Sequence, residues 1–370
     1  MLRMLKSRLL YVAVALVFTS SVHALQEGEG LRPLKAAEWK LERDVAGDAR
    51  REHAIGLLPQ LRVTLDQVLM DCNREGKRVT GVPGVSKLHS AFEWQQDDQN
   101  TKNWYPQGIT GRTVGERKLL LVSWYDKTDL RGVRLSFCDV TDPTRPRYRH
   151  VLLVEPVEAN LTTQLKPVKV HAGGIAWVGE FIYVVDTNNG FRVFDMRELR
   201  QVPSNELAST FDYAYVLPQT SAWKHATGSK TAIFSSVSVD RTTSPPTLVT
   251  CEYRSSDVKG RVFRWKLDAK GRLGAGAKTT VASEAFSAAQ SRLQGVASVR
   301  GEWFLSCSSQ EKTRGSLYVT KAGTKSLERS WAYGPESLYV ASGGYLWSLS
   351  EHPGERRVFS VKLGDYDSKK

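Results

Sequence analysis

A repeat of strand-forming segments is the sequence feature that most constrains the fold. Five times between residues 85 and 366, a step of small residues leads into an apolar stretch, and two further segments rich in Val, Leu, Tyr, Phe and Trp follow. The apolar anchors of the five openings are Ile109, Ile175, Val237, Val296 and Leu338.

The spacing of these anchors favours one architecture. Successive anchors are 66, 62, 59 and 42 positions apart, and a four-stranded propeller blade needs about 40 to 50 residues, more where loops are inserted. A small twisted sheet cannot bury both faces alone, whereas radially stacked sheets bury them against one another. The sequence therefore predicts an all-β fold, a β-propeller of about five blades over residues 81–366. A six-bladed ring and an irregular β-sandwich are the alternatives.

Two features bear on how the ring is held together. The segment Val85–Gln95 predicts a strand that closes the ring with the last blade. Cys251 and Cys307 take the same place in the second strand of adjacent repeats, which allows either a disulfide or two buried thiols. Cys72 and Cys138 have no such relation, and no C-x-x-C motif is present.

The N-terminal residues differ from the repeats. Arg3, Lys6 and Arg8 precede the apolar run Leu9–Phe18, and a small-x-small cleavage site ends at Ala24. This pattern is typical of a secretory signal peptide over residues 1–24, with an uncleaved anchor as the alternative. The sequence thus predicts a secreted protein, extracellular or periplasmic.

Residues 25–80 favour helix. Leu34–Arg43 is rich in good helix formers, and Leu and Val recur at three- and four-residue steps over Leu57–Leu69. We expect a helical N-terminal arm packed on the propeller, and a polar tail at residues 367–370.

The charge balance limits the class of partner. Fifty-two Lys and Arg against 39 Asp and Glu give a net charge of +13, mostly scattered along the chain. A solvated basic surface of this kind allows contact with anionic polymers or head groups. No basic cluster alternates with stacking aromatics, so a nucleic-acid partner is not predicted. No stretch beyond the signal is long and apolar enough for a stable membrane span.

Several segments also carry a resemblance to known proteins. The segments are Trp104–Ile109, His171–Ile175, Leu293–Val296 and Leu346–Gly354. They resemble a set of largely uncharacterised secreted bacterial β-propeller proteins, and Cys138–Pro146 resembles the inter-blade turn of the LVIVD-type propeller repeat. The resemblance covers roughly residues 85 to 366. It implies a propeller fold and export, but it implies no particular activity.

The repeat openings supply the candidate ligand-binding residues, because propellers present ligands at one mouth of the channel where first strands converge. The polar residues of the openings are Gln107, His171, Ser235 or Ser236, Gln294 and Glu336. Together they would form a polar ring suited to a sugar, a small polar ligand or a partner protein, with Trp104 and Tyr105 as apolar contacts. Alternatively they bond only to one another and to trapped water.

His171 is the most versatile of these residues. It precedes Ala172-Gly173-Gly174, where missing side chains allow a ligand to approach, and an imidazole can act as acid, base or ligand. A metal site is not predicted because no local ligand spacing supports one. The identity of any other cofactor stays open.

Two functions follow from this ring. The leading interpretation is a non-catalytic binding or scaffold module that recognises a glycan or partner protein. The alternative is a glycoside-directed hydrolase with Glu336 and Glu351 as its carboxyl pair and His171 assisting, which needs the two carboxyls about 5 to 10 Å apart. No nucleophile elbow and no Walker loop supports another enzyme class.

Overall fold

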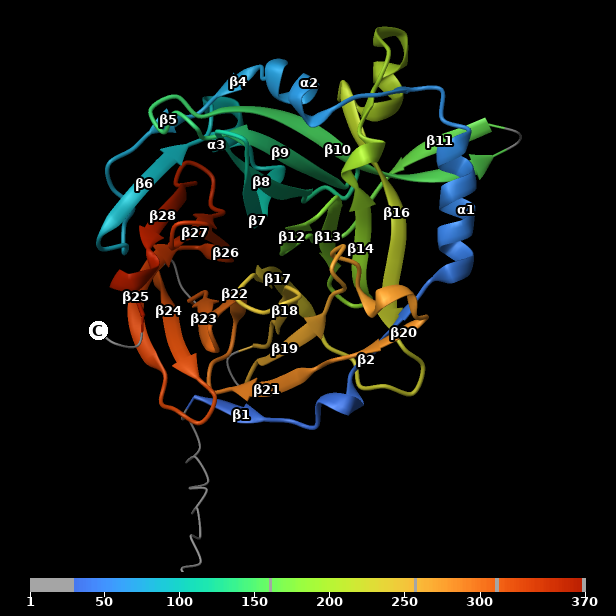
Figure 1. The fold of residues 1–370 in the computed structure, drawn as a ribbon. Coiled ribbons are helices and arrows are strands. Elements are labelled where there is room, and N and C mark those ends of the chain that lie inside the picture. Colours follow the sequence, from blue (N-terminus) through green and yellow to red (C-terminus); the bar gives the residue numbers. More distant parts are fainter. Residues whose placement is uncertain (1–29, 160–161, 256–257, 310–312, 368–370) are drawn as a thin grey trace, which may run out of the picture.

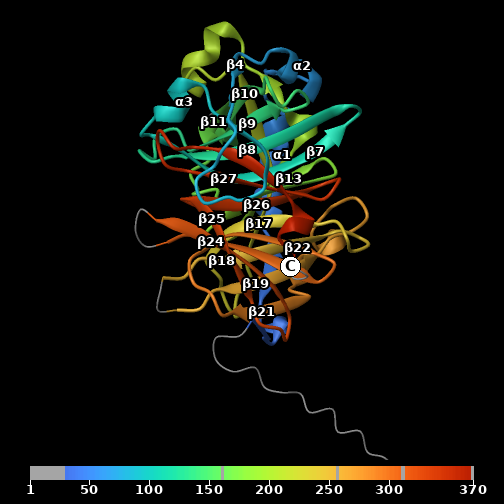
Figure 2. The same ribbon diagram turned by 90° about the vertical axis from the view of Figure 1, so that its left-hand side faces the viewer.

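The computed structural model describes residues 30–159, 162–255, 258–309 and 313–367. The predicted signal peptide lies outside these residues, as do the last three residues of the predicted polar tail. The described chain is mostly β-strand, and its strands form consecutive four-stranded antiparallel groups around a common axis (Figures 1 and 2).

Five such groups can be followed along the chain, and in each the first strand is the innermost and the last is the outermost. The first two groups belong to one 14-stranded sheet, in which their last strands pair in parallel. The first contains β7 (Trp104–Val114), β8 (Arg117–Asp126), β9 (Val133–Asp139) and β10 (Arg147–Ala159). The second contains β12 (Ile175–Val178), β13 (Phe181–Asp186), β14 (Gly190–Asp195) and β16 (Tyr215–His225). The third contains β17 (Phe234–Asp240), β18 (Thr247–Glu252), β19 (Arg261–Lys266) and β21 (Glu284–Ala288). The fourth contains β22 (Leu293–Val299), β23 (Glu302–Cys307), β24 (Arg314–Lys321) and β25 (Leu327–Tyr333). The fifth contains β26 (Pro335–Ala341), β27 (Tyr345–Ser350), β28 (Val358–Lys362) and β6 (Leu88–Glu93).

The three strands predicted in each repeat are therefore present, and β6 confirms the predicted closing strand. β6 pairs with β28 in antiparallel register, Phe92 opposite Val358, so an N-terminal strand completes the sheet that the C-terminal strands begin.

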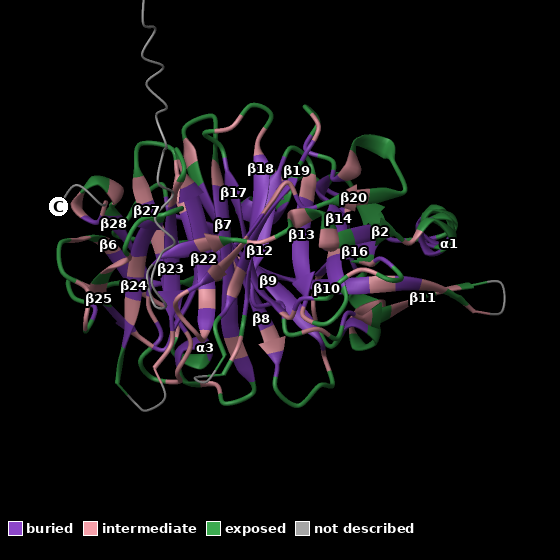
Figure 3. Cartoon of the chain, turned by 90° about the horizontal axis from the view of Figure 1, so that it is seen from below, coloured by how far each residue is buried: buried purple, intermediate pink, exposed green. Residues whose placement is uncertain are grey.

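The core lies between neighbouring sheets rather than at the centre of one large sheet. Five hydrophobic clusters each join consecutive groups, the last group packing back on the first. Pairs of residues that belong to the same cluster are Leu121 and Trp177, Tyr183 and Phe263, Val249 and Leu305, Phe304 and Phe359, and Trp124 and Leu349. Figure 3 shows the strands buried over most of their length and the exposed residues gathered in the connecting loops. This is the packing of a β-propeller.

Small residues let the inner strands approach one another closely. Gly108, Gly174 and Gly295 directly precede the anchors of three inner strands, and Ser236 and Ser337 hold the same place in the other two. A Cβ on Gly174 would lie 2.2 Å from the backbone nitrogen of Val237, and one on Gly295 would lie 2.6 Å from the carbonyl oxygen of Glu336. The hydroxyl oxygens of Ser236 and Ser337 are 2.8 Å apart. The backbones of neighbouring inner strands are thus in close contact at this level of the ring.

The helical N-terminal arm is not confirmed. Leu34–Arg43 forms a 3-10 turn, η1 (Ala36–Glu38), and a strand, β2 (Lys40–Arg43), instead of a helix. β2 pairs with β16 and with β20 (Thr279–Val281), and its Leu41 is completely buried. The free edges of these strands offer backbone hydrogen bonds, which outweigh a helix preference of less than about 1 kcal/mol per residue.

Helices do occur elsewhere in the N-terminal segment. α1 (Val45–Gly56) begins at Asp44, whose side chain accepts a hydrogen bond from Gly47, and it lies outside the ring (Figure 1). α2 (Leu65–Met70) begins with a capping box formed by Thr64 and Gln67. In the predicted apolar stripe over Leu57–Leu69, only the C-terminal part is helical.

The remaining short elements lie at sheet edges and in loops. The edge strands and hairpins are β1 (Leu31–Pro33), β3 (Leu61–Arg62), β4 (Arg74–Glu75), β5 (Lys77–Arg78), β11 (Thr162–Pro167) and β15 (Arg200–Gln201). The helical turns are α3 (Gln96–Asn100), η2 (Met196–Glu198), η3 (Ser204–Thr210), η4 (Gly274–Gly276) and η5 (Leu363–Asp365). None of the helices in the described ranges has the length and apolar character needed to cross a bilayer.

The cysteines carry no bridge. Cys72, Cys138, Cys251 and Cys307 are all buried and free. Cys251 and Cys307 belong to one hydrophobic cluster, as their equivalent places predict, but they remain thiols. Burial raises the pKa of the Cys251 thiol to about 12, so it stays protonated and unreactive.

Candidate functional site

The same irregularity occurs near the start of four inner strands. In β7, β17, β22 and β26 the register with the neighbouring strand shifts over residues 107–108, 235, 294 and 336–337. A β-bulge of this kind adds an unpaired residue and re-aims its side chain. Gln107, Gln294 and Glu336, which the sequence placed at the channel mouth, all lie at these bulges.

The bulge residues form two pairs of amide and carboxyl groups. The Gln107 side-chain nitrogen donates to Oε2 of Glu351 at 2.9 Å, and the Gln294 side-chain nitrogen donates to Oε1 of Glu336 at 3.1 Å. The structure therefore brings together both candidate carboxyl residues and both candidate amides. Each pair also contains one buried oxygen that has no hydrogen-bond partner among the described residues. These oxygens are Oε1 of Gln107 and Oε2 of Glu336.

Glu336 is held in its neutral form. Its exposure is only 1 %. Burial raises the pKa of Glu336 well above its usual range, and the nearby charge of Glu351 raises it further, against a smaller lowering by the Gln294 hydrogen bond. The protonated carboxylic acid form of Glu336 is therefore favoured, and in that form the group can donate as well as accept a hydrogen bond.

Glu351 is the accessible member of the carboxyl pair. Its side chain is 22 % exposed, and Nδ1 of His352 lies 3.9 Å from its Oε1. Burial raises the pKa of Glu351, while the charge of His352 and the Gln107 hydrogen bond lower it. The electrostatic effect of Glu351 on Glu336 places the two carboxyl groups in one neighbourhood.

A pocket of about 590 Å³ opens beside these pairs, and Gln294 and Glu351 form part of its wall. Three rings also line it, those of Tyr253, Tyr333 and His352, and the Tyr333 and His352 rings pack at a centroid distance of 4.6 Å. The volume suits a small ligand. The pocket thus combines ring faces with hydrogen-bonding groups.

Arg356 fixes the loop that carries Glu351. Its guanidinium is completely buried and donates to the carbonyl oxygens of Asp98, Gln99, Thr101, Trp104 and Glu351. No carboxylate among the described residues forms an ion pair with it. Burial lowers the pKa of Arg356 to about 10, so it remains charged at neutral pH.

His171 and Tyr105 lie next to the pairs through Tyr125. His171 is an exposed residue, but its ring stacks on that of Tyr125 at a centroid distance of 4.4 Å, and Tyr105 packs against Tyr125 at 5.8 Å. Burial of the ring lowers the pKa of His171, so its neutral imidazole is favoured at pH 7. Burial and the carboxyl groups of Glu351 and Glu336 raise the pKa of Tyr125 to about 12.

Trp104 is not brought to this mouth. It is 4 % exposed and lies between the guanidinium groups of Arg131 and Arg134, whose carbons are 4.8 and 4.5 Å from its ring centroid. It lines a different pocket, of about 360 Å³. Ser235 is internal as well, because its hydroxyl donates to the carbonyl of Leu293 at 2.6 Å.

Sequence reasoning missed Tyr253, Tyr333 and Arg356. Tyr253 directly follows the second strand of its group and Tyr333 ends an outer strand, and no repeated pattern marks either position as a ligand contact. Arg356 sits in a polar turn and has the composition of a solvated residue. Over the described ranges, no group of three or more His, Cys, Asp or Glu side chains is placed to hold a metal ion.

The raised pKa of Glu336 predicts a measurable pH dependence of stability. Because its folded-state pKa lies above the unfolded value, the contribution of Glu336 to wild-type stability is fully present below about pH 4.5 and is lost, by up to about 1.4 kcal/mol per pH unit, as pH rises toward the folded pKa. Glu336→Gln mimics the neutral acid and removes this loss. We expect thermal melts to show equal stability near pH 4 and a growing advantage for the variant up to pH 8.

Glu116→Gln, at an exposed turn, is the matched control and should follow the wild-type curve. A difference between wild type and Glu336→Gln that stays constant with pH would contradict the neutral assignment.

Comparisons with known proteins add little to this geometry. No protein-family model matches the sequence, and no curated protein is significantly similar to it. Similar solved structures include a GH43_1 enzyme from Xanthomonas citri, with 10 % identity, 80 % of this chain and 92 % of that chain covered, and a TM-score of 0.39.

Two further structures have other activities in their names. A glucose dehydrogenase has 8 % identity, 78 % and 96 % coverage and a TM-score of 0.34. The β-propeller domain of the Trilobed protease from Pyrococcus furiosus has 11 % identity, 70 % and 71 % coverage and a TM-score of 0.27. Similarities of this size transfer no function, so the function is argued from the site.

Proposed function

We propose that the protein is an exported β-propeller of five blades that binds a hydroxyl-rich ligand, a glycan, at the mouth formed by the bulged inner strands. The five four-stranded groups with a hydrophobic cluster between each support the blade count. Export rests on the signal-like residues 1–24.

One observation carries the ligand assignment, the convergence of two amide–carboxyl pairs on an aromatic-lined pocket. Gln294 and Glu351 form its wall, and behind them Gln107 Oε1 and Glu336 Oε2 lack hydrogen-bond partners among the described residues. Sugar hydroxyls donate and accept at once, and the C–H faces of a sugar pack on rings such as those of Tyr253 and Tyr333. A carbohydrate therefore matches both halves of the pocket.

The burial of Glu336 favours binding over hydrolysis. A glycosidase needs one carboxylic acid at the leaving oxygen and one ionised carboxylate at the sugar or at a water. The neutral state of Glu336 fits the first role, but a side chain that is 1 % exposed cannot reach a substrate in the pocket. Glu351 alone is accessible, and one of its oxygens is held by Gln107.

The test is a glycan array followed by calorimetry with the best-bound glycan. We expect Gln107→Leu and Glu351→Gln each to weaken binding about tenfold, because each removes a hydrogen bond to or beside a charged group. Glu116→Gln, which makes the same charge change as Glu351→Gln on the exposed β7–β8 turn, should bind as the wild type does.

A panel of chromogenic glycosides run in parallel separates the two functions. Product release that Glu351→Gln abolishes would overturn the binding assignment in favour of hydrolysis. Absence of both glycan binding and turnover would also contradict the proposal and favour a protein partner.

A further inference from the structure

Carboxyl groups lie at one mouth of the channel and arginines at the other. The inner strands begin at the mouth that holds Glu336 and Glu351, and they end at the opposite mouth. Gln107 and Arg112 lie five residues apart on β7, which corresponds to about 16 Å along a strand. At the far mouth Arg112 lies on β7, Arg241 follows β17 and Arg300 follows β22.

Arg112 and Arg241 are anchored on the same short strand. A terminal nitrogen of Arg112 donates to the carbonyl oxygen of Gly179 at 2.9 Å, and one of Arg241 donates to that of Trp177 at 2.8 Å. They come from β7 and β17, the inner strands on either side of β12. Both guanidinium groups therefore converge on the C-terminal end of β12.

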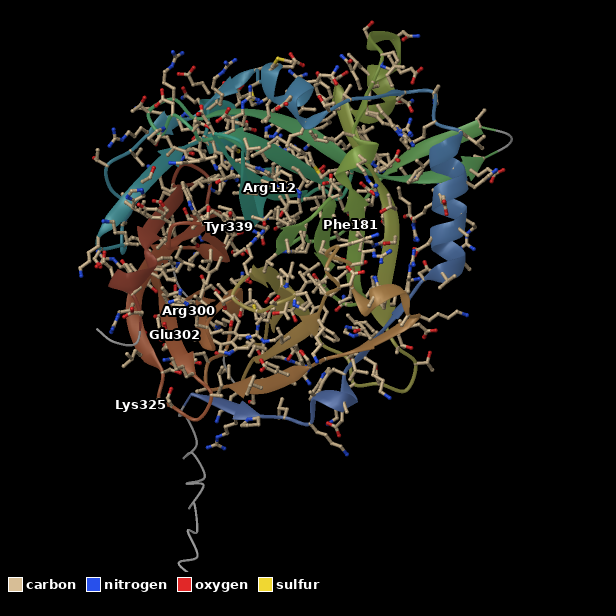
Figure 4. All side chains as sticks on the ribbon, in the orientation of Figure 1. Arg112, Phe181, Arg300, Glu302, Lys325 and Tyr339 are labelled. Carbon is tan, nitrogen blue, oxygen red and sulfur yellow. The ribbon has the colours of Figure 1, made fainter. Side chains whose placement is uncertain are left out.

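Each of the two guanidinium groups packs over an aromatic ring. The guanidinium carbon of Arg112 lies 4.8 Å from the Trp177 ring centroid, and that of Arg241 lies 5.9 Å from the Tyr339 centroid. Tyr339 also packs against β7, since a Cβ on Gly111 would be 2.9 Å from its ring. Figure 4 shows Arg112 and Tyr339 near the centre of the ring. Stacked guanidinium groups are preorganised, so less side-chain entropy is lost on binding.

Neither guanidinium is neutralised within the described part of the chain. No carboxylate oxygen there lies within 4.0 Å of a nitrogen of Arg112 or Arg241, the limit for an ion pair. Desolvation of the guanidinium and the like charge of Arg112 lower the pKa of Arg241, whereas Tyr339 raises it. Asp240, next in sequence, is already bonded to Arg264 and Ser298, each at 2.8 Å.

Two other arginines of the propeller are arranged differently, because each forms an ion pair with an aspartate. Arg134 and Arg264 likewise lie over aromatic rings, those of tryptophans, but both are buried. Each also has an aspartate oxygen at 2.6 or 2.8 Å. Placing two like charges together without a counterion costs free energy unless an anion joins them. Arg241 is exposed and Arg112 is half-buried, so both can be reached from solvent.

We propose that Arg112 and Arg241 bind an oxyanion (a carboxylate, sulfate or phosphate group of an acidic ligand) at the far mouth of the channel. Each arginine uses one nitrogen on a backbone carbonyl and keeps other N–H donors for the anion. A pocket of about 1100 Å³ opens beside Arg241 and also includes Arg300, which leaves room for the rest of the ligand. Its lining also includes three acidic residues, Glu302 at the start of β23, and Asp365 and Asp367 at and after the end of η5.

The proposal is tested by calorimetry at constant ionic strength with three probes: inorganic phosphate, oligogalacturonate and dextran sulfate, with neutral dextran as the uncharged polymer. We expect saturable binding of at least one anion. Arg241→Gln and Arg112→Gln should each weaken it about tenfold. Arg50→Gln, on the exposed face of α1, makes the same charge change away from the mouth and should bind as the wild type does.

The probes also separate the sources of the anion. Phosphate binding indicates a free oxyanion, and binding of only one polymer indicates a carboxylate or a sulfate on a chain. Because Arg241 is exposed, its variant should keep the wild-type melting temperature, which removes misfolding as an explanation. The proposal is overturned if no probe binds saturably, if both variants bind as tightly as the wild type, or if Arg50→Gln loses as much affinity as they do.

Discussion

Replacing Arg356 with methionine is expected to lower the free energy of unfolding by about 3–5 kcal/mol, a large part of the total stability of an ordinary domain. The methionine keeps the apolar stem but removes the guanidinium donor from five carbonyl oxygens, and three of these hydrogen bonds are fully buried. Urea denaturation at pH 7 measures the change.

The same substitution should also weaken glycan binding, because Arg356 holds the carbonyl of Glu351 at 2.8 Å. Arg78→Met, an exposed arginine on β5, is the control and should change stability by less than about 1 kcal/mol. Equal losses in the two variants would show that the buried guanidinium does not clamp the loop.

Replacing Gly174 with alanine should destabilise the protein by about 3 kcal/mol or more. The added methyl group would lie 2.2 Å from the backbone nitrogen of Val237 and 2.6 Å from the Cα of Ser236. Those atoms belong to β17, which is itself fixed between neighbours, so neither side of the contact can move without opening the ring. Thermal and chemical unfolding should both report the loss.

Gly56→Ala provides the matched control. Its Cβ would meet nothing within 4 Å at the end of α1, and alanine favours helix, so stability should be unchanged or rise by up to about 1 kcal/mol. If Gly174→Ala were as mild as Gly56→Ala, the inner strands would be less tightly closed than the contacts indicate.

The sequence predicted the strands well because their burial leaves a repeated pattern of apolar residues. It failed for Leu34–Arg43, where every residue preference favours helix but the edges of β16 and β20 recruit a strand. Pairing at a sheet edge depends on tertiary structure. Within the local sequence of β2, only the apolar Leu41, which is buried in the structure, indicates it.

The sequence could predict which residues belong to the candidate site, but not which of them form hydrogen bonds with one another. Gln107, Gln294 and Glu336 were found because they share one place in the repeat. That the bulges turn Gln107 toward Glu351, in the last sheet, depends on closure of the ring. A repeated position also marks the far mouth in the sequence. Arg241 lies four residues beyond the anchor Val237, and Arg300 lies four residues beyond the anchor Val296.

The pairing of β6 with β28 has a consequence for how the chain is made. The ribosome produces β6 long before its partner at residues 358–362, because most of the propeller lies between them in the sequence. Until β28 is made, the fifth group cannot form and β6 presents an unpaired edge that can aggregate. Closure of the ring therefore depends on a contact between strands far apart in the sequence, and a nascent chain benefits from being kept apart from its neighbours until that contact forms.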